Sequence, residues 1–579
     1  MNGKRLLIVG GVAGGMSAAA RARRLSEDAE IVVFERGPHV SFANCGLPYY
    51  VGGEIADRDE LLLQTPASLK ARFNLDVRVQ TEVLAIDRAN RRVRVRDLAS
   101  GRESEAAYDA LILSTGAAPL RPPIPGLDRE GHFPVRNVPD ADRIKSWIKD
   151  RQARRAVVVG GGYIGLEMAE QLVRLGLAVT LVEALPQVMA PLDPELASWL
   201  HAELKANGVA LHLADPVAAF EAPGEGEAGA TSVVVLRSGA RLPADVVVLG
   251  LGVKPDVGLA RAAGLEIGEL GGLRVNPQMQ TSDPHIWAVG DAVEVRHAVL
   301  GHWQLIPLAG PANRQGRIAA DNIFGREARY EGTLGTAVLR LFKLTAACTG
   351  ANETALFKSG RPYQALHLHP ASHAGYYPGA SPITLKVLFA PENGLLLGAQ
   401  AVGCDGVEKR IDVLATALKA GMTVHDLAEL ELSYAPPFGS AKDPVNLAGM
   451  AAQNVLDGYV ELAQWNELPH LDPAQTLVLD VRSPQERAAG HIPGSMHIPL
   501  PELRARLDEL PRDREIVVSC LSGQRSYFAC RMLSQKGFRV RNLTGSYRTW
   551  KAAQSIAPLN WHTARPSQPQ VLAAASLER

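Results

Sequence analysis

Runs of branched apolar residues are followed by glycine turns and helical segments in the first half of the chain. "RLLIV", which begins at Arg5, precedes "GGVAGGMSAAARARRL", and this order predicts a short β-strand, a tight turn and a helix that begins with small residues. "RRAVVVGGGYIGLEMAEQL" (154–172) repeats the order. A strand, a glycine turn and a helix open a βαβ unit, so the pattern predicts two such units in an α/β protein.

The spacing of the glycines in both turns is typical of dinucleotide binding. Gly10 and Gly15 fit the first and third positions of the glycine fingerprint, with a valine where the second glycine is usual. Gly160, Gly162 and Gly165 have the full spacing. Such glycines let the backbone approach a pyrophosphate, whose charge lies on the N–H groups at the helix N-terminus. The spacing therefore argues against a signal peptide, which the basic and apolar N-terminus resembles.

An acidic residue ends the next strand in each unit. Glu35 follows Gly15, and Glu183 follows Gly165, each at the distance expected of a residue that binds ribose hydroxyls. A carboxylate there repels a 2′-phosphate, and residues 184 to 204 contain no Arg or Lys that could bind one. The second unit therefore favours NADH over NADPH.

Length and composition limit the class of protein. A chain of 579 residues predicts three or four domains. Lys plus Arg and Asp plus Glu both number 61, so neither nucleic acid nor a membrane surface is expected as a partner. The five cysteines lack the spacing of a disulfide scaffold or a metal site, and we expect no metal. They suit a reducing compartment, which favours the cytoplasm.

The chain resembles the two-dinucleotide flavoprotein disulfide reductases from residue 1 to about 450. The resemblance rests on the two fingerprints and on three later strand ends, at 111–119, 246–255 and 281–292. The resemblance implies FAD on the first unit, NADH on the second and a dimerisation domain in the last third. The cofactor contacts that it implies are Gly10, Gly11, Ala13, Gly14, Gly15, Glu35, Val83, Thr115, Gly116, Gly160, Gly162, Gly165, Glu183, Gly252, Gly290 and Asp291.

The segment "VSFANCGLPYY" (40–50) contains one cysteine, Cys45. Members of the family with a redox disulfide have two cysteines five residues apart, and here Tyr50 takes the second position, so Cys45 acts alone. We expect its surroundings to stabilise the reactive thiolate. Single-cysteine members are either peroxide or oxygen reducers or coenzyme A disulfide or persulfide reductases. "SFANCG" resembles the second group, and residues 6 to 20 lack the histidine usual in the first glycine loop of peroxidases.

Coenzyme A carries phosphates, and Arg21 and Arg24 lie three residues apart on one face of the first predicted helix. The resemblance implies that Ser17, Arg21, Arg24, Ser41, Asn44 and Lys442 contact coenzyme A. It also implies that Tyr376 and Tyr434 of a partner subunit reach the thiol, where a tyrosine can donate a proton to a departing thiolate. Tyr377 remains an alternative to Tyr376.

The last part of the chain resembles a rhodanese domain through "LDVRSPQERAAGHIPGSMHIP" (479–499) and "EIVVSCLSGQRSYFACRML" (515–533). Cys520 ends a strand and begins a loop whose N–H groups, with Arg525 nearby, would hold a persulfide anion. Gly523 permits the tight curl of that loop. Cys530 is interpreted as a core residue, and the two remaining cysteines, at 348 and 404, as packing residues.

The predicted fold is α/β, with two Rossmann-like nucleotide-binding domains, an α+β dimerisation domain and a C-terminal α/β rhodanese domain. The predicted boundaries are 1–150 with 255–325 for FAD, 151–254 for NAD, 326–452 for dimerisation, 453–466 for a linker, 467–556 for rhodanese and 557–579 for a tail. The predicted activity is NADH-dependent reduction of coenzyme A persulfide, coenzyme A disulfide or a related per- or polysulfide by a homodimer. Two alternatives are an NADH oxidase or peroxidase that uses a Cys45 sulfenic acid, and a sulfur carrier or redox sensor that docks onto a partner protein.

Overall fold

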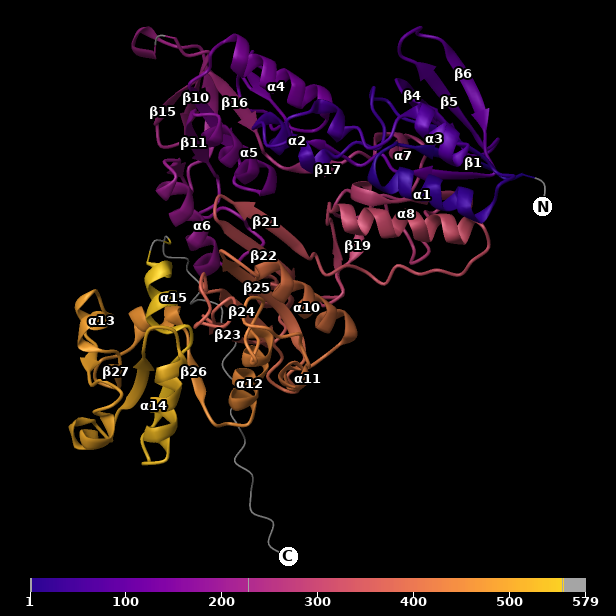
Figure 1. The fold of residues 1–579 in the computed structure, drawn as a ribbon. Coiled ribbons are helices and arrows are strands. Elements are labelled where there is room, and N and C mark those ends of the chain that lie inside the picture. Colours follow the sequence, from indigo (N-terminus) through magenta and orange to yellow (C-terminus); the bar gives the residue numbers. More distant parts are fainter. Residues whose placement is uncertain (1–2, 228, 555, 557–579) are drawn as a thin grey trace, which may run out of the picture.

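The computed structural model describes residues 3–227, 229–554 and 556. The predicted tail, 557–579, lies outside the described residues. In Figure 1 the two N-terminal units occupy the upper part of the molecule, the dimerisation domain lies below them, and the C-terminal domain lies at the lower left. Among the described helices, none is both long and apolar enough to cross a membrane.

The first unit is a parallel five-stranded sheet in the order β18-β7-β1-β2-β3. Its strands are β1 (Arg5–Val9), β2 (Glu30–Phe34), β3 (Asp76–Arg78), β7 (Ala110–Leu113) and β18 (Ile286–Ala288). Helix α1 (Ala13–Leu25) packs closely on α8 (Ala309–Ile323), and a Cβ at Gly316 would lie 2.2 Å from the Gly14 carbonyl oxygen. An antiparallel sheet of β4 (Thr81–Asp87), β5 (Arg92–Asp97) and β6 (Glu103–Ala107) accompanies this unit.

The second unit is another parallel sheet, in the order β12-β11-β10-β16-β9. Its strands are β9 (His132–Phe133), β10 (Arg155–Val159), β11 (Ala178–Val182), β12 (Ala210–His212) and β16 (Val246–Leu249), with helices α4 (Val138–Asp150), α5 (Tyr163–Arg174) and α6 (Pro194–Ala206). Strand β9 pairs with β16, and α4 packs on both strands. Residues 132–150, assigned from the sequence to the first unit, therefore pack with the second sheet.

The dimerisation domain is an antiparallel sheet in the order β21-β22-β25-β24-β23. Its strands are β21 (Ala337–Leu341), β22 (Leu344–Gly350), β23 (Gln364–Leu368), β24 (Thr384–Phe389) and β25 (Leu396–Gly403), and its helices are α9 (Glu353–Ser359), α10 (Val407–Ala420), α11 (Val424–Glu429) and α12 (Pro444–Leu456). Cys348 on β22 is buried as predicted, whereas Cys404 is exposed. The prediction that Cys404 is a packing residue is wrong, because this residue lies just after β25 ends.

The C-terminal domain is a parallel sheet in the order β26-β30-β29-β27-β28. Its strands are β26 (Glu461–Ala463), β27 (Thr476–Asp480), β28 (Met496–His497), β29 (Glu515–Ser519) and β30 (Val540–Leu543), and its helices are α13 (Pro484–Ala488), α14 (Gln524–Ser534) and α15 (Ser546–Ala553). Because β26 belongs to this sheet, the sheet begins inside the segment 453–466 that was predicted to be a linker.

Hydrogen bonds fix the C-terminal domain to strand β23 of the dimerisation sheet. The side-chain amide of Gln464 donates to the Ala365 carbonyl at 2.9 Å. The backbone N–H of His367 donates to the Thr544 hydroxyl at 2.7 Å. Helix α15 also packs against α6 of the second unit. The C-terminal domain therefore contacts both the dimerisation sheet and the second unit.

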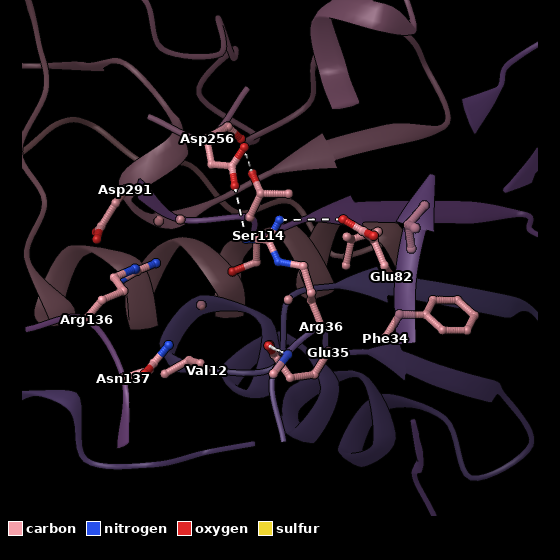
Figure 2. Close-up of a pocket in the computed structure, with 18 of the residues that line it drawn as sticks. Val12, Phe34, Glu35, Arg36, Glu82, Ser114, Arg136, Asn137, Asp256 and Asp291 are labelled. Atoms are coloured by element: carbon pink, nitrogen blue, oxygen red, sulfur yellow. Dashed lines mark hydrogen bonds and ion pairs between the residues drawn. The ribbon is translucent and has the colours of Figure 1, made fainter. Parts of the chain in front are cut away.

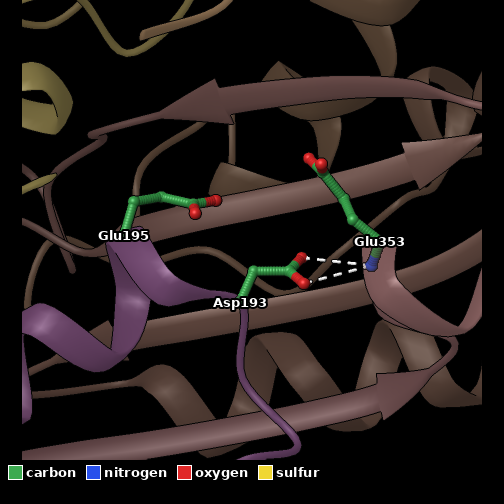
Figure 3. A group of neighbouring side chains, drawn as sticks. All are labelled: Asp193, Glu195 and Glu353. Carbon is green, nitrogen blue, oxygen red and sulfur yellow. Dashed lines mark hydrogen bonds between the residues drawn. The ribbon is translucent and has the colours of Figure 1, made fainter. Parts of the chain in front are cut away.

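A buried charge cluster joins α6 to the dimerisation domain. Figure 3 shows the carboxylates of Asp193, which precedes α6, Glu195 on α6 and Glu353 on α9 close to one another. The ammonium of Lys386 on β24 lies 2.7, 2.5 and 2.8 Å from these three carboxylates, and the Nε2 atom of His367 lies 2.8 Å from Glu195. The lysine ammonium occupies the place at which the carboxylates could hold a metal ion, so the cluster is an internal ion-pair network.

Candidate active site

A cavity of about 630 Å³ opens where strands β1 and β2 end (Figure 2). Ligands of open α/β sheets bind at the carboxyl ends of the strands, so this is where a nucleotide is expected. Nine of the predicted cofactor contacts line the cavity. They are Gly10, Ala13, Gly14, Glu35, Val83, Thr115, Gly116, Gly290 and Asp291.

The first glycine turn is built so that only glycine fits at two positions. Gly10 has φ +100°, and a Cβ there would lie 2.1 Å from the Ser114 carbonyl oxygen. A Cβ at Gly15 would lie 1.9 Å from the Gly10 carbonyl oxygen. The glycine turn therefore brings the start of α1 against the end of β1. The first turn of helix α1 contains no acidic residue. These features fit the pyrophosphate of FAD at the start of α1.

Two carboxylates among the predicted cofactor contacts, Glu35 and Asp291, line this cavity. Glu35 accepts hydrogen bonds from the backbone N–H groups of Gly11 (2.8 Å) and Gly37 (2.7 Å), which fix its carboxylate beside the glycine turn. Burial raises the pKa of Asp291, and Arg136 opposes this shift. Figure 2 shows Arg136 on the same side of the cavity as Asp291. The sequence contained no signal for Arg136, which precedes a helix far from both fingerprints.

The second glycine turn repeats the geometry of the first. Gly160 has φ +108°, and its Cβ would lie 2.1 Å from the Gly250 carbonyl oxygen, while a Cβ at Gly165 would lie 1.9 Å from that of Gly160. Apart from Gly162 and its two chain neighbours, no described residue has a heavy atom within 4 Å of a Cβ built at Gly162, so a ligand can approach its backbone. Glu183 accepts from the N–H of Gly161 at 2.7 Å, as Glu35 does in the first unit. The turn fits a second dinucleotide.

Cys45 lies in a short turn of 3₁₀ helix (Asn44–Gly46) just before α2 (Leu47–Val51). It is exposed, and its thiol lies 3.8 Å from Asn44 Oδ1. Asn44 itself lines the first cavity. Tyr50, at the position of the second cysteine of disulfide-using reductases, is buried and its hydroxyl donates to Asp142 at 3.1 Å. The structure therefore leaves Cys45 as a single thiol beside the first cavity.

The side chains around Cys45 disfavour a thiolate. Although Cys45 is exposed to solvent, the protein atoms around it partly desolvate its thiol and raise the pKa, and the carboxylates of Glu167 and Asp291 raise it further. Burial also raises the pKa of Glu167 to about 7, although a hydrogen bond from the Tyr49 hydroxyl at 3.1 Å lowers it. The nearby carboxylates therefore oppose the thiolate, and its stabilisation by a helix N-terminus or nearby donors stays a prediction.

We expect Glu167→Gln to make Cys45 more reactive toward iodoacetamide in a pH-dependent way. Removing a negative charge should lower the pKa of the thiol by roughly 0.5–1 unit. Because the pKa of Glu167 is about 7, this residue is largely neutral below that pH, and the alkylation rates of the variant and the parent should converge there. Above pH 7 the variant should react faster. The same substitution at exposed Glu105 is the control, and equal rates at pH 8.5 would contradict the assignment.

The predicted coenzyme A contacts differ in whether their side chains already have a partner within the protein. Arg21 already pairs with Asp321 at 2.6 Å and is largely buried between α1 and α8, whereas Arg24 is exposed. The Ser17 hydroxyl donates to Asn313. Ser41 has φ +50°, and its backbone N–H donates to the Gly11 carbonyl. Asn44 adjoins Cys45, and Lys442 is exposed. Among the predicted coenzyme A contacts, Arg24 and Lys442 are the two cations that form no ion pair with a described residue, so both can bind a phosphate.

Two of the predicted tyrosines lie together on the surface of the dimerisation domain. The hydroxyls of Tyr376 and Tyr434 are 3.1 Å apart, and the residues are 77% and 47% exposed. Tyr377 instead packs edge-on against the ring of His373. This arrangement favours Tyr376 over Tyr377 as the neighbour of Tyr434, and exposed hydroxyls can reach a second subunit.

The C-terminal cysteine loop curls around one sulfur, as predicted. The Cys520 sulfur accepts from the Gly523 N–H at 3.1 Å and from the Ser526 hydroxyl at 3.4 Å. Gly523 has φ +103°, which explains the glycine. Arg525 donates to both carboxylate oxygens of Glu486, and these bonds lower the pKa of Glu486 to about 2. Cys530 is buried in the core, where burial raises the pKa of its thiol.

Three family models match the chain. The model of the pyridine nucleotide-disulphide oxidoreductases matches residues 4–316, that of their dimerisation domain matches 337–444, and that of the rhodanese-like domain matches 462–553. The matched segments follow the order of the sheets described above.

Among similar proteins, the coenzyme A disulfide reductase of Staphylococcus haemolyticus is 34% identical over 78% of this chain and 100% of its own length. An NADH oxidase of Methanocaldococcus jannaschii is 35% identical over 77% of this chain and 97% of its own length.

Two solved structures match nearly the whole chain. Reduced CoADR-RHD of Bacillus anthracis is 47% identical, with a TM-score of 0.93, and the match covers 96% of this chain and all of that one. A NAD-dependent persulfide reductase from A. fulgidus is 39% identical, with a TM-score of 0.88, over 94% of this chain and all of that one. The chain described here therefore belongs to the pyridine nucleotide-disulphide oxidoreductase family and carries a rhodanese-like domain at its C-terminal end.

Proposed function

We propose that this chain uses NADH to reduce coenzyme A persulfide, coenzyme A disulfide or a related per- or polysulfide through Cys45, and that Cys520 handles sulfane sulfur. As a member of its family it uses FAD and NAD(P)H. The observation that carries the proposal is the presence on one chain of a single thiol beside the flavin cavity and a second thiol in a persulfide-binding loop.

In the proposed reaction, the Cys45 thiolate attacks the inner sulfur of coenzyme A persulfide. The bond between the two persulfide sulfurs breaks, hydrosulfide leaves, and Cys45 forms a mixed disulfide with coenzyme A. A bound FAD supplies the electron pair from NADH that the mixed disulfide needs. Tyr376 or Tyr434 of a partner subunit can donate a proton to the departing coenzyme A thiolate. The products are sulfide, coenzyme A and NAD⁺.

The chain's own residues hold the reactants for this reaction. The turn at Gly160 to Gly165, with Glu183, binds NADH, and the turn at Gly10 to Gly15, with Glu35 and Asp291, binds FAD. Arg24 and Lys442 meet the phosphates of coenzyme A. The proposal includes a homodimer, supported by the dimerisation domain, and a cytoplasmic location, supported by thiols that must stay reduced.

The test is anaerobic NADH oxidation by the purified holoenzyme with coenzyme A persulfide, coenzyme A disulfide and hydrogen peroxide in turn. The proposal expects the sulfur substrates to be turned over fastest, with NADH preferred to NADPH. Faster turnover of peroxide would favour the alternative, an NADH oxidase or peroxidase with a Cys45 sulfenic acid, which the relative named NADH oxidase keeps open. Slow turnover of every small substrate would favour a sulfur carrier or redox sensor.

We expect Cys520→Ser to separate the two sulfur sites. It should abolish sulfite release from thiosulfate, because a serine cannot accept the sulfane sulfur. It should leave NADH oxidation with preformed coenzyme A persulfide within about twofold of the parent, because that reaction uses Cys45. Cys530→Ser, ten residues further along the same domain, is the matched control and should retain sulfite release. A Cys520→Ser protein that still releases sulfite would remove Cys520 from the proposed function.

A further inference from the structure

Two loops of the dimerisation domain carry exposed aromatic side chains. Residues 372–377, between β23 and β24, contain Tyr376, and residues 434–442, between α11 and α12, contain Tyr434 and Phe438. These three side chains are 77%, 47% and 72% exposed. We call the two segments the tyrosine loops. The hydroxyls of Tyr376 and Tyr434 lie 3.1 Å apart, so the loops present one surface although 58 positions separate the tyrosines in the sequence.

One buried guanidinium holds both tyrosine loops. Arg410 lies on α10, in the dimerisation domain of Figure 1, and is 1% exposed. Its Nη2 atom donates to the Ser372 carbonyl of the first loop at 2.8 Å and to the carboxylate of Asp443, directly after the second loop, at 2.9 Å. Its Nε atom donates to the same carboxylate at 3.3 Å, and its Nη1 atom donates to the Gly406 carbonyl at 3.1 Å. Arg410 therefore ties an end of each loop to the same helix.

The tyrosine loops are also bonded to each other. The backbone N–H of Ala374 in the first loop donates to the Gly439 carbonyl of the second at 2.8 Å. Asp443 is the N-cap of α12, and its carboxylate accepts from the Val445 N–H at 3.1 Å. A second cation, Lys409, lies 3.9 Å from this carboxylate, but its side chain is 33% exposed. Arg410 is therefore the buried counterion that connects the first loop, the second loop and α12.

The shape of the side chain at position 410 matters as well as its charge. A guanidinium is planar and carries five N–H donors in fixed directions, whereas an ammonium is a single donor atom. The donors of Arg410 reach a carboxylate and two carbonyls in different parts of the chain. A lysine at this position keeps a positive charge beside Asp443, but its one nitrogen atom cannot make all of these contacts.

We propose that Arg410 is the positioning residue of the Tyr376–Tyr434 pair, and that it holds the two hydroxyls at the spacing at which they act together on a thiolate of a partner subunit. This inference rests on the proposed function, in which a tyrosine of the partner donates a proton to the departing coenzyme A thiolate. The exposed aromatic surface of the tyrosine loops suits contact with a second copy of this chain, which the match to the dimerisation domain supports.

The two hydroxyls have different roles in this arrangement. The hydrogen bond to Tyr434 raises the pKa of Tyr376, which favours Tyr376 as the donor in that bond. The proton of Tyr434 is then free to move to the coenzyme A thiolate, where an S–H bond forms as the O–H bond of Tyr434 breaks. The Tyr434 phenolate keeps the hydrogen bond from Tyr376 and regains a proton from solvent. A wider spacing would remove that stabilisation and slow the proton transfer.

The experiment uses the full-length holoenzyme with Arg410→Lys. Arg482→Lys is the matched control, because Arg482 is also 1% exposed and pairs with an aspartate, Asp480, at 2.7 Å, but lies in the C-terminal domain. The first measurement is amide hydrogen exchange, followed by mass spectrometry of peptides that cover the tyrosine loops. The second is anaerobic NADH oxidation with preformed coenzyme A persulfide, together with the stopped-flow rate of FAD reduction by NADH.

Arg410→Lys should speed exchange in both tyrosine loops, because the bond between Ala374 and Gly439 opens more often. It should lower kcat by about tenfold, since part of the general-acid contribution is lost, and leave the rate of FAD reduction unchanged. In a Tyr434→Phe background the same substitution should lower kcat by less than about twofold, because Arg410 acts through that hydroxyl. Arg482→Lys should change none of these values.

A second variant keeps the inference testable if Arg410→Lys folds poorly. Asp443→Asn keeps the shape of the side chain and its capping oxygen but weakens its bond to the guanidinium, so it should give smaller changes in the same direction. Unchanged exchange in the tyrosine loops of both variants overturns the inference. A kcat loss that persists in full in the Tyr434→Phe background also overturns it, because the effect then does not pass through the tyrosine.

These outcomes are distinguishable from a failure of the proposed function. If the parent does not reduce coenzyme A persulfide, the proposed function falls, and the exchange data alone decide whether Arg410 holds the loops. If Tyr434→Phe lowers kcat and Arg410→Lys does not, the function stands and the inference falls. If Tyr434→Phe keeps the kcat of the parent, reduction through Cys45 stands, but there is no acting hydroxyl for Arg410 to position and the inference falls.

Discussion

Replacing Cys45 by serine should lower kcat/KM for NADH-dependent reduction of coenzyme A persulfide by roughly 10³-fold or more, because no other group can form the mixed disulfide. Anaerobic NADH oxidation and sulfide release should fall together. The rapid reduction of bound FAD by NADH, followed by its absorbance in stopped flow, should persist, because hydride transfer from NADH does not use the thiol.

The chain offers a matched control for this substitution. Cys404 is also an exposed free cysteine, so Cys404→Ser tests the loss of a surface thiol without touching the cavity beside Cys45. It should retain the activity of the parent. If Cys45→Ser kept more than a tenth of the parent's turnover, the mixed-disulfide reaction would be excluded, and the single cysteine at this position would be structural.

Replacing Lys386 by methionine should destabilise the protein by about 3–5 kcal/mol, because it leaves buried carboxylates without their counterion. Lys386 is 1% exposed, and Asp193 and Glu195 are buried as deeply. Burial lowers the pKa of Lys386, but the three carboxylates raise it more, and the net result is a pKa well above the ordinary value. The measurement is calorimetric unfolding of the holoenzyme, in which the transition that includes the dimerisation domain should move to lower temperature.

An exposed ion pair provides the control for the buried one. Lys419 lies 3.3 Å from Glu331, and both side chains are more than half exposed. Lys419→Met should cost less than about 1 kcal/mol. Adding Glu195→Gln to Lys386→Met should recover part of the lost stability, because it removes one of the unpaired charges. Equal shifts of the unfolding temperature for Lys386→Met and Lys419→Met would contradict the role assigned to the cluster.

Local sequence was sufficient to predict the two glycine turns and the loop around Cys520. Gly10, Gly160 and Gly523 adopt positive φ angles, and this requirement is visible in the residue type. The positions of Glu35 and Glu183 could be predicted because the next strand brings each of them beside the glycine turn of its own unit. These features depend on residues close to one another in the chain.

Features that depend on distant residues could not be predicted in this way. The ion pair that occupies Arg21 comes from Asp321, 300 residues later, and the sequence gives no reason to connect them. The sequence around Lys386 has no pattern that distinguishes a buried counterion from a surface lysine. The burial and pairing of charged groups therefore required the three-dimensional structure.

The C-terminal domain also has a consequence for the solubility of the reductase. Strand β23 is an edge of the dimerisation sheet, and an open edge is a template for pairing with strands of other molecules. Gln464 and Thr544 occupy the outward-facing backbone groups of Ala365 and His367 on this edge. A chain that ended before this domain would expose those groups, so we expect the fused domain to protect the sheet from aggregation in addition to its proposed role in binding sulfur.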